Sequence, residues 1–185
     1  MDFFTLAFDP GQYNNSWAFC FSTLRIRGES VAFCPLEVGF VPVLEDPPRP
    51  DFSKHKIWLE ELFKKYPQAL GRTTLVAERF VGRGLTGKMA EYISIGLGFW
   101  AGVWSLQSLG PVRFIMAAQW KVPLKKLNVK YSVLKTTKFE NWWEDYFAFY
   151  QENPKTVHIQ DACGMAYWFN KFEIKNACVI DNLDF

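Results

Sequence analysis

The sequence predicts an α/β fold in which a mixed five-stranded sheet is covered by helices on both faces. Three short apolar runs near the start of the chain are separated by turn residues, which is typical of an antiparallel meander. Two later apolar runs alternate with helical segments, which is typical of βα crossovers. The chain of 185 residues is 49% hydrophobic and 18% aromatic, so it can bury one substantial core. We expect the element order βββαβαβα in a single domain spanning residues 1–185.

The first three strands are expected to pair in sequence order. Residues 3–8 form a nearly continuous apolar run, which is typical of a buried central strand. This run stops at Asp9, where a proline and a glycine then turn the chain. Residues 16–21 and 30–34 are further apolar runs that follow turn residues, and they complete the predicted meander.

A loop and an amphipathic helix are expected next. The stretch 42–50 is rich in proline and predicts a loop. Residues 51–66 fit a helix that Asp51 or Ser53 caps. Its apolar face comprises Trp58, Leu59, Leu62, Phe63 and Tyr66.

The second half of the chain predicts the crossovers and the closing helices. The expected elements are a strand at 73–77, a glycine-rich loop at 81–87, a long helix at 88–107, a strand at 112–117, short helices and loops at 119–138, an aromatic-rich helix at 139–150 and a last helix at 161–172.

Composition argues against export and membrane insertion. The most apolar stretch, residues 93–106, is shorter than the roughly 18 residues of a membrane span and contains three glycines. The N-terminus carries Asp2 and no basic region, so we expect no secretory signal. The four cysteines show no paired spacing and are expected to be reduced thiols. We therefore predict a cytoplasmic protein.

Charge is distributed unevenly along the chain, whose formal net charge is +2. Residues 72–138 contain eleven Lys or Arg and two acids, a net charge of +9, which leaves −7 for the rest. Such a basic sector predicts a polyanionic substrate bound through its phosphates. A solvated charged face explains the charge equally well, and the sequence leaves both interpretations open.

Three carboxylates are expected at one edge of the sheet. Asp9 and Glu78 each follow a predicted strand, and neighbouring strands lie about 4.8 Å apart. Asp161 opens the last predicted helix, and His158 precedes it by three residues. Carboxylates packed this closely repel each other, which a hard divalent cation relieves. Two such ions would clamp the attacking water and the leaving oxygen of phosphodiester hydrolysis.

Each of these four residues also has a purely structural interpretation. Asp9 suits a turn, Asp161 suits a helix N-cap, and His158 suits an ordinary loop. Glu78 suits an ion pair with a following arginine. Their joint occurrence in this order along the chain favours the metal site.

Four segments resemble motifs of the RuvC family of Holliday-junction resolvases, within the RNase H-like superfamily. Leu-Ala-Phe-Asp-Pro-Gly at 6–11 resembles the motif of the first strand, and Val-Ala-Glu-Arg-Phe at 76–80 resembles that of the fourth. Residues 153–162 resemble the closing motif, in which a His or Asp precedes the final Asp by three. Residues 117–121 resemble a segment that carries a lysine facing the DNA. The matches span nearly the whole chain in order.

The resemblance implies an RNase H-like domain and a crossover junction endodeoxyribonuclease. Such an enzyme is a homodimer that uses Mg²⁺ or Mn²⁺, two ions per site, to nick opposing strands of a four-way DNA junction. Asp9, Glu78, His158 and Asp161 would be its catalytic residues and metal ligands. The protein would then be intracellular, associated with the nucleoid or with viral DNA.

The resemblance also implies a DNA-binding surface. Phe80 sits one residue away from the position where the family inserts an aromatic into the junction. The segment 125–151 is longer than the family pattern, as in divergent viral or phage members with a broader range of branched substrates. Residues carried over to DNA contact are Arg79, Phe80, Arg83 and Lys88 beside the branch point, and Lys121, Lys125, Lys126 and Lys130 on phosphates.

The long helix at 88–107 is expected to form the dimer interface. Small residues recur along it at spacings of three and four, which lets another helix approach closely, although packing on its own sheet would use them equally well. The small residues are Ser94, Gly98, Ala101, Gly102 and Ser105.

Two other functions stay open. The chain could be another RNase H-like nuclease acting on flaps or RNA–DNA hybrids, or a junction-binding protein that does not cut.

Overall fold

The computed structural model describes most of the predicted elements. The described residues are 2–11, 14–24, 31–42, 44–45, 49–50, 52–79, 87–107, 109–126 and 157–173. The strands are β1 (Asp2–Asp9), β2 (Asn14–Leu24), β3 (Val31–Pro42), β4 (Leu44–Glu45), β5 (Arg49–Pro50), β6 (Thr73–Glu78) and β7 (Val112–Ile115). The helices are α1 (Ser53–Lys65), the short 3₁₀ helix η1 (Pro67–Ala69), α2 (Lys88–Leu106), α3 (Ala117–Lys126), α5 (Val157–Trp168) and the π-helical turn η4 (Phe169–Glu173).

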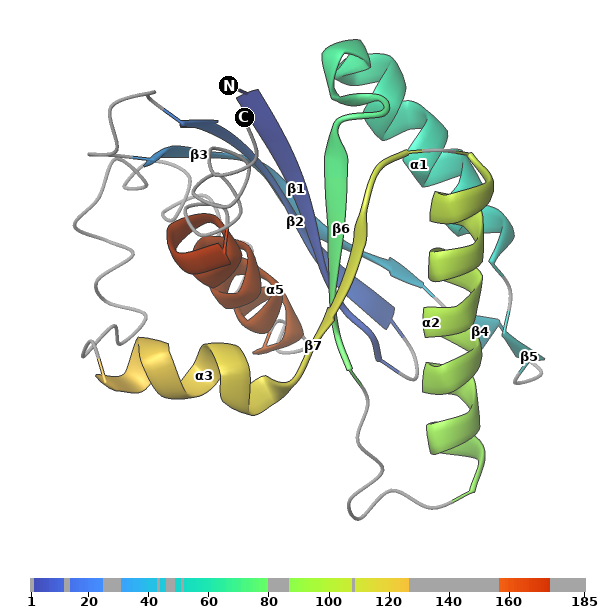
Figure 1. Ribbon diagram of the computed structural model, residues 1–185. Coiled ribbons are helices and arrows are strands. Elements are labelled where there is room, and N and C mark those ends of the chain that lie inside the picture. The colour runs from blue at the N-terminus through green and yellow to red at the C-terminus, as the bar shows by residue number, and fades with distance from the viewer. Residues whose placement is uncertain are drawn as a thin grey trace.

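The main sheet has the strand order β3-β2-β1-β6-β7 (Figure 1). β1, β2 and β3 form an antiparallel meander, whereas β1, β6 and β7 run parallel to one another. The mixed, partly parallel sheet predicted from the sequence is therefore confirmed. β6 lies between two parallel neighbours, and its side chains are buried along most of its length, as expected for a strand covered on both faces.

Helices cover the two faces of the sheet separately. α1 and α2 lie on one face, and α5 lies on the other, with α3 beside it (Figure 1). Alternate residues of β1 enter the two cores, because side chains along a strand point to opposite faces. Leu6 and Phe8 belong to the core under α1 and α2, whereas Ala7 packs in the core under α5. The next residue on the α5 side of β1 is Asp9.

Several predicted boundaries need correction. The loop expected at 42–50 contains the small ribbon formed by β4 and β5. Neither Asp51 nor Ser53 is the N-cap of α1, because that position belongs to Phe52, which makes no side-chain capping bond. The last helix begins at Val157, four residues earlier than expected. The helix predicted at 139–150 lies outside the described residues.

Large aromatic side chains fix the packing of the helices on the sheet. Trp100 and Trp104 of α2 are buried beneath that helix, and Trp104 Nε1 donates to the Thr73 carbonyl at 3.2 Å. On the other face Trp120 of α3 is equally buried.

Among the described residues, no helix has both the length and the apolar character needed to cross a bilayer.

Candidate active site

Asp9 and Glu78 lie side by side at the carboxyl ends of two parallel strands. The register pairs Phe8 with Ala77, so the next residue on each strand is a carboxylate. Both carboxylates lie on the α5 side, since Ala7 and Val76, two positions earlier on each strand, belong to the α5 core. Asp9 is only 7% exposed. The parallel pairing expected from the sequence is confirmed, and it brings two acids together at a buried edge.

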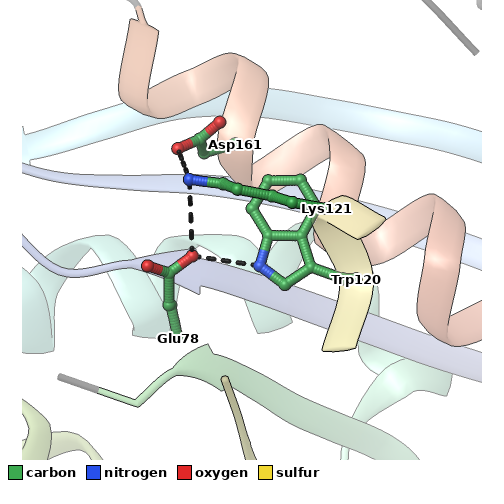
Figure 2. Close-up of polar contacts among 4 residues, drawn as sticks. All are labelled: Glu78, Trp120, Lys121 and Asp161. Carbon is green, nitrogen blue, oxygen red and sulfur yellow. Dashed lines mark hydrogen bonds and ion pairs between the residues drawn. The ribbon is translucent and has the colours of Figure 1, made fainter. Parts of the chain in front are cut away.

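Asp161 reaches the same edge from α5, and the ammonium of Lys121 lies between the acids. Lys121 Nζ is 2.7 Å from Asp161 Oδ2 and 3.8 Å from Glu78 Oε2 (Figure 2). Asp161 stands in the second turn of α5 and is not its N-cap, because the helix begins at Val157. The N-cap interpretation of Asp161 is therefore wrong.

Trp120 holds the carboxylate of Glu78 in place, a role that the sequence did not predict. Its indole Nε1 donates to Glu78 Oε2 at 3.0 Å, and its ring is 2% exposed (Figure 2). Gly164 of α5 makes room for this ring, since a Cβ there would lie 2.6 Å from Trp120 Cζ3. Lys121 Nζ also lies 4.8 Å from the ring centroid. The sequence signal for this role was that Trp120 stands next to Lys121 in the segment 117–121, which resembles a RuvC-family motif.

The charged groups of the site influence one another. Burial raises the pKa of Glu78, and the charges of Asp9 and Asp161 raise it further, against the opposing effects of Lys121 and Trp120. Burial lowers the pKa of Lys121, but the hydrogen bond to Asp161 and the three negative charges outweigh burial and raise it. Three carboxylates and one ammonium thus form one electrostatic unit.

The donor set suits a hard divalent cation. Among the described residues, no three His, Cys, Asp or Glu side chains are grouped closely enough to hold a metal ion as they stand. Instead the Lys121 ammonium occupies the position of a cation between Glu78 and Asp161. The three acids offer only carboxylate oxygens as ligands, which is the ligand type that Mg²⁺ and Mn²⁺ prefer. The residue types therefore match such an ion, and its binding at these acids would require the ammonium to move.

The remaining predicted site residues are placed only in part. His158 lies in the first turn of α5, three residues before Asp161, so the backbone puts both on one side of the helix. Arg79 directly follows β6 and is exposed. Lys88 begins α2, and Lys125 and Lys126 end α3. The predicted contacts Phe80, Arg83 and Lys130 lie outside the described residues.

Comparison with known proteins shows the fold of this chain. No protein-family model matches the sequence, and no curated protein is similar to it in sequence. The structure is similar to that of Thermus thermophilus RuvC in complex with Holliday junction substrate, with a TM-score of 0.56 and 14% identity. That similarity covers 91% of this chain and 95% of RuvC.

Two weaker similarities complete the comparison. A second Thermus thermophilus RuvC structure gives a TM-score of 0.46 at 15% identity over 64% of this chain and 66% of that one. An Aquifex aeolicus PPX-GPPA enzyme gives a TM-score of 0.32 at 11% identity, and the similarity covers 65% of this chain and 38% of that one. Scores this low carry no argument. The RuvC-like fold expected from the sequence is confirmed by the similarity to the RuvC–junction complex, and the viral or phage origin stays a prediction.

Proposed function

We propose that this chain is a metal-dependent DNA endonuclease that resolves four-way junctions by paired, symmetric nicks. The observation that carries the proposal is the meeting of Asp9, Glu78 and Asp161 around one cationic group at the sheet edge. The similarity to RuvC over nearly the full length of both chains supports branched DNA as the substrate, since that RuvC structure holds a Holliday junction.

In this proposal the three carboxylates would hold the metal ions, and His158 would act on the attacking water. Asp9, at the end of the central strand, would help to hold Mg²⁺ or Mn²⁺. Glu78 would hold one ion from β6, and Asp161 the other from α5. Such ions supply an activated water and a stabilised leaving oxygen at the phosphodiester. Trp120 fixes the Glu78 carboxylate, and His158, one turn before Asp161, would orient the attacking water.

Basic residues around the site would bind the DNA backbone. Arg79 follows directly after Glu78 and is exposed, and α3 carries Lys121 beside the acids. The sector from residue 72 to 138 has a net charge of +9. Phosphate neutralisation by such residues gives affinity without sequence preference. Junction shape would then provide the selectivity.

A homodimer through α2 would place two sites on a substrate that is itself nearly two-fold. Ser94, Gly98 and Gly102 are exposed on α2. Among the described residues, no atom lies within 4 Å of a Cβ added at Gly98 or Gly102, so these glycines are not needed for the packing of α2 on its own sheet. A two-fold interface uses the same face of both copies, and small residues let two helices approach closely.

The variant Asp9→Asn tests the metal site separately from DNA binding. We expect it to bind a labelled four-way junction as tightly as wild type, because binding rests on the basic surface. We expect no cleavage in Mg²⁺ or Mn²⁺. A variant that still cuts would show that the site is wrong, and a wild type that binds without cutting would favour the non-cleaving junction-binding protein.

A further inference from the structure

Lys121 stands where the acidic site needs a positive charge. Its Nζ is 2.7 Å from Asp161 Oδ2 and 3.8 Å from Glu78 Oε2, and the charge of Asp9 acts on it as well. The two contacted acids come from different elements, β6 and α5. Without a cation between them their like charges would repel across a partly buried site. The Lys121 ammonium therefore offsets the repulsion between the two carboxylates, as a bound metal ion would.

The same side chain is able to leave. It is 45% exposed, whereas the side chains of Asp161 and Glu78 are 16% and 22% exposed. A lysine carries its charge on a flexible four-carbon stem, so the ammonium can move while the backbone stays fixed. The neighbouring Trp120 is buried and donates a hydrogen bond to Glu78. These contacts of Trp120 hold α3 in place while the Lys121 side chain moves. The Trp120 ring, 4.8 Å from Nζ, keeps a favourable interaction within reach.

We propose that Lys121 is an internal counter-ion of the metal site, which holds Glu78 and Asp161 together in the metal-free protein and is displaced when a divalent ion binds. The ammonium and the ion compete for the same carboxylate oxygens, and two cations at close range repel each other. This inference rests on the proposed function, because it requires the ion to bind at these acids.

Displacement links the binding of metal and DNA. An ammonium that has left Asp161 is available to a phosphate at the edge of the site. A phosphate that holds the ammonium away in turn removes the competitor of the ion. By linkage, each ligand then raises the affinity for the other by the same factor. The metal-free protein keeps its acids paired until both ligands arrive.

Mn²⁺ titration by calorimetry without DNA tests the exchange. We compare the wild type with Lys121→Met, which removes the competing charge and keeps the aliphatic stem. We expect the variant to bind Mn²⁺ about three- to tenfold more tightly, the range expected for removing a partly exposed ion pair. Arg79→Met is the matched control, since it removes an exposed charge next to Glu78. For this control we expect less than about a twofold change.

Lys121→Arg and NMR extend the test to proteins that keep the charge. The arginine variant retains a competing cation, so its Mn²⁺ affinity should stay within about twofold of wild type. In the wild type, the ammonium signal of Lys121 should shift on addition of Mg²⁺, as the ammonium moves away from Asp161. The NMR readout keeps the inference testable even if Lys121→Met folds poorly.

The outcomes separate the two proposals. Tighter binding in Lys121→Met alone, together with the NMR shift, supports the exchange. Mn²⁺ binding to the wild type with equal affinity in all variants, or an equal gain in Arg79→Met, overturns the exchange and leaves the proposed function standing. A wild type that binds no Mn²⁺ overturns both.

Discussion

At the scale of single residues, Trp120 connects the candidate site to the core. Its ring is buried against α5, where Gly164 leaves room for it, and its indole nitrogen donates to Glu78. The candidate site and the packing of α3 on α5 therefore depend on the same side chain. A change that moves this ring should affect both stability and the position of the acid.

Gly164→Ala should destabilise the protein, although alanine is the better helix former. The added Cβ would lie 2.6 Å from Trp120 Cζ3, so the ring or the helix must move. We expect a loss of about 1–3 kcal/mol in the free energy of unfolding, the usual cost of overpacking a core. Gly96→Ala on α2 is the control, because its added Cβ would make only an ordinary contact with Phe52, at 3.8 Å. That variant should gain about 0.5–1 kcal/mol. Equal effects in urea unfolding would contradict the packing described.

Glu78→Gln should stabilise the metal-free protein at neutral pH. Burial raises the folded-state pKa of Glu78 above its ordinary 4.5, so the folded state holds the proton more tightly than the unfolded state. The stability from that proton is fully present below 4.5 and is lost as pH rises through the folded pKa. Glutamine, which stays neutral, avoids this loss and keeps an acceptor for Trp120.

The gain expected for Glu78→Gln at pH 7 in a chelator is about 0.5–1 kcal/mol, within the range of mutations that relieve a functional site. Urea unfolding at pH 4 and pH 7 measures it. Glu61→Gln, at an exposed position of α1, controls for the loss of one negative charge. A gain that is the same at both pH values would show that the carboxyl of Glu78 titrates normally.

At the scale of elements, the outward side of α2 is the proposed dimer interface. Its inward side is fixed by Trp100 and Trp104, whereas an added Cβ at Gly98 or Gly102 would contact none of the residues that the structure describes. If two copies meet there, Gly98→Glu should place a charge in the interface and give a monomer of unchanged helical content. Sedimentation measures the mass. Gln68→Glu, an exposed change on η1, should stay dimeric, and a dimeric Gly98→Glu would exclude α2 as the interface.

Elements were predicted well where the pattern of apolar residues was dense. β1 and β6 were found because their side chains are buried on both faces, which leaves an almost unbroken apolar run. The start of α5 was missed because its first turn carries no acidic residue, whereas Asp161 in the second turn resembles a helix start. The ribbon of β4 and β5 was missed because two-residue strands leave no periodic signal.

The sequence predicted that Asp9 and Glu78 lie close together, but it did not predict the contacts that Lys121 and Trp120 make with the acids. Asp9 and Glu78 could be placed together from strand order alone, since parallel neighbours end at the same edge. The pairing of Lys121 with Asp161 joins residues 40 positions apart in two helices, and nothing in the local sequence specifies it. The role of Trp120 depends equally on tertiary packing.

At the scale of the whole molecule, the two faces of the sheet carry different features. The acids and Lys121 gather beside α5 on one face, and α2, which we propose as the dimer interface, lies on the other face (Figure 1). The basic sector, residues 72–138, includes β6, α2, β7 and α3. This arrangement would let a dimer bind a junction while each protomer cuts one strand.

Arg79→Gln should weaken junction binding and reduce its salt dependence. Removing one Arg–phosphate ion pair lowers the slope of log affinity against log salt concentration by about one. Fluorescence anisotropy at several salt concentrations measures this slope. Lys56→Gln on α1 removes the same charge on the opposite face and should leave the slope unchanged. Identical slopes for Arg79→Gln and wild type would remove Arg79 from the DNA surface.

The measurement that tests the central claim most directly is cleavage of a labelled four-way junction in Mg²⁺, beside a flap, a plain duplex and an RNA–DNA hybrid. It compares the wild type with Asp161→Asn, which preserves the shape of the side chain and removes its charge. We predict paired, symmetric nicks in the junction by the wild type and none by the variant. Cutting of the hybrid alone, or equal cutting by the variant, would contradict a junction resolvase built on these carboxylates.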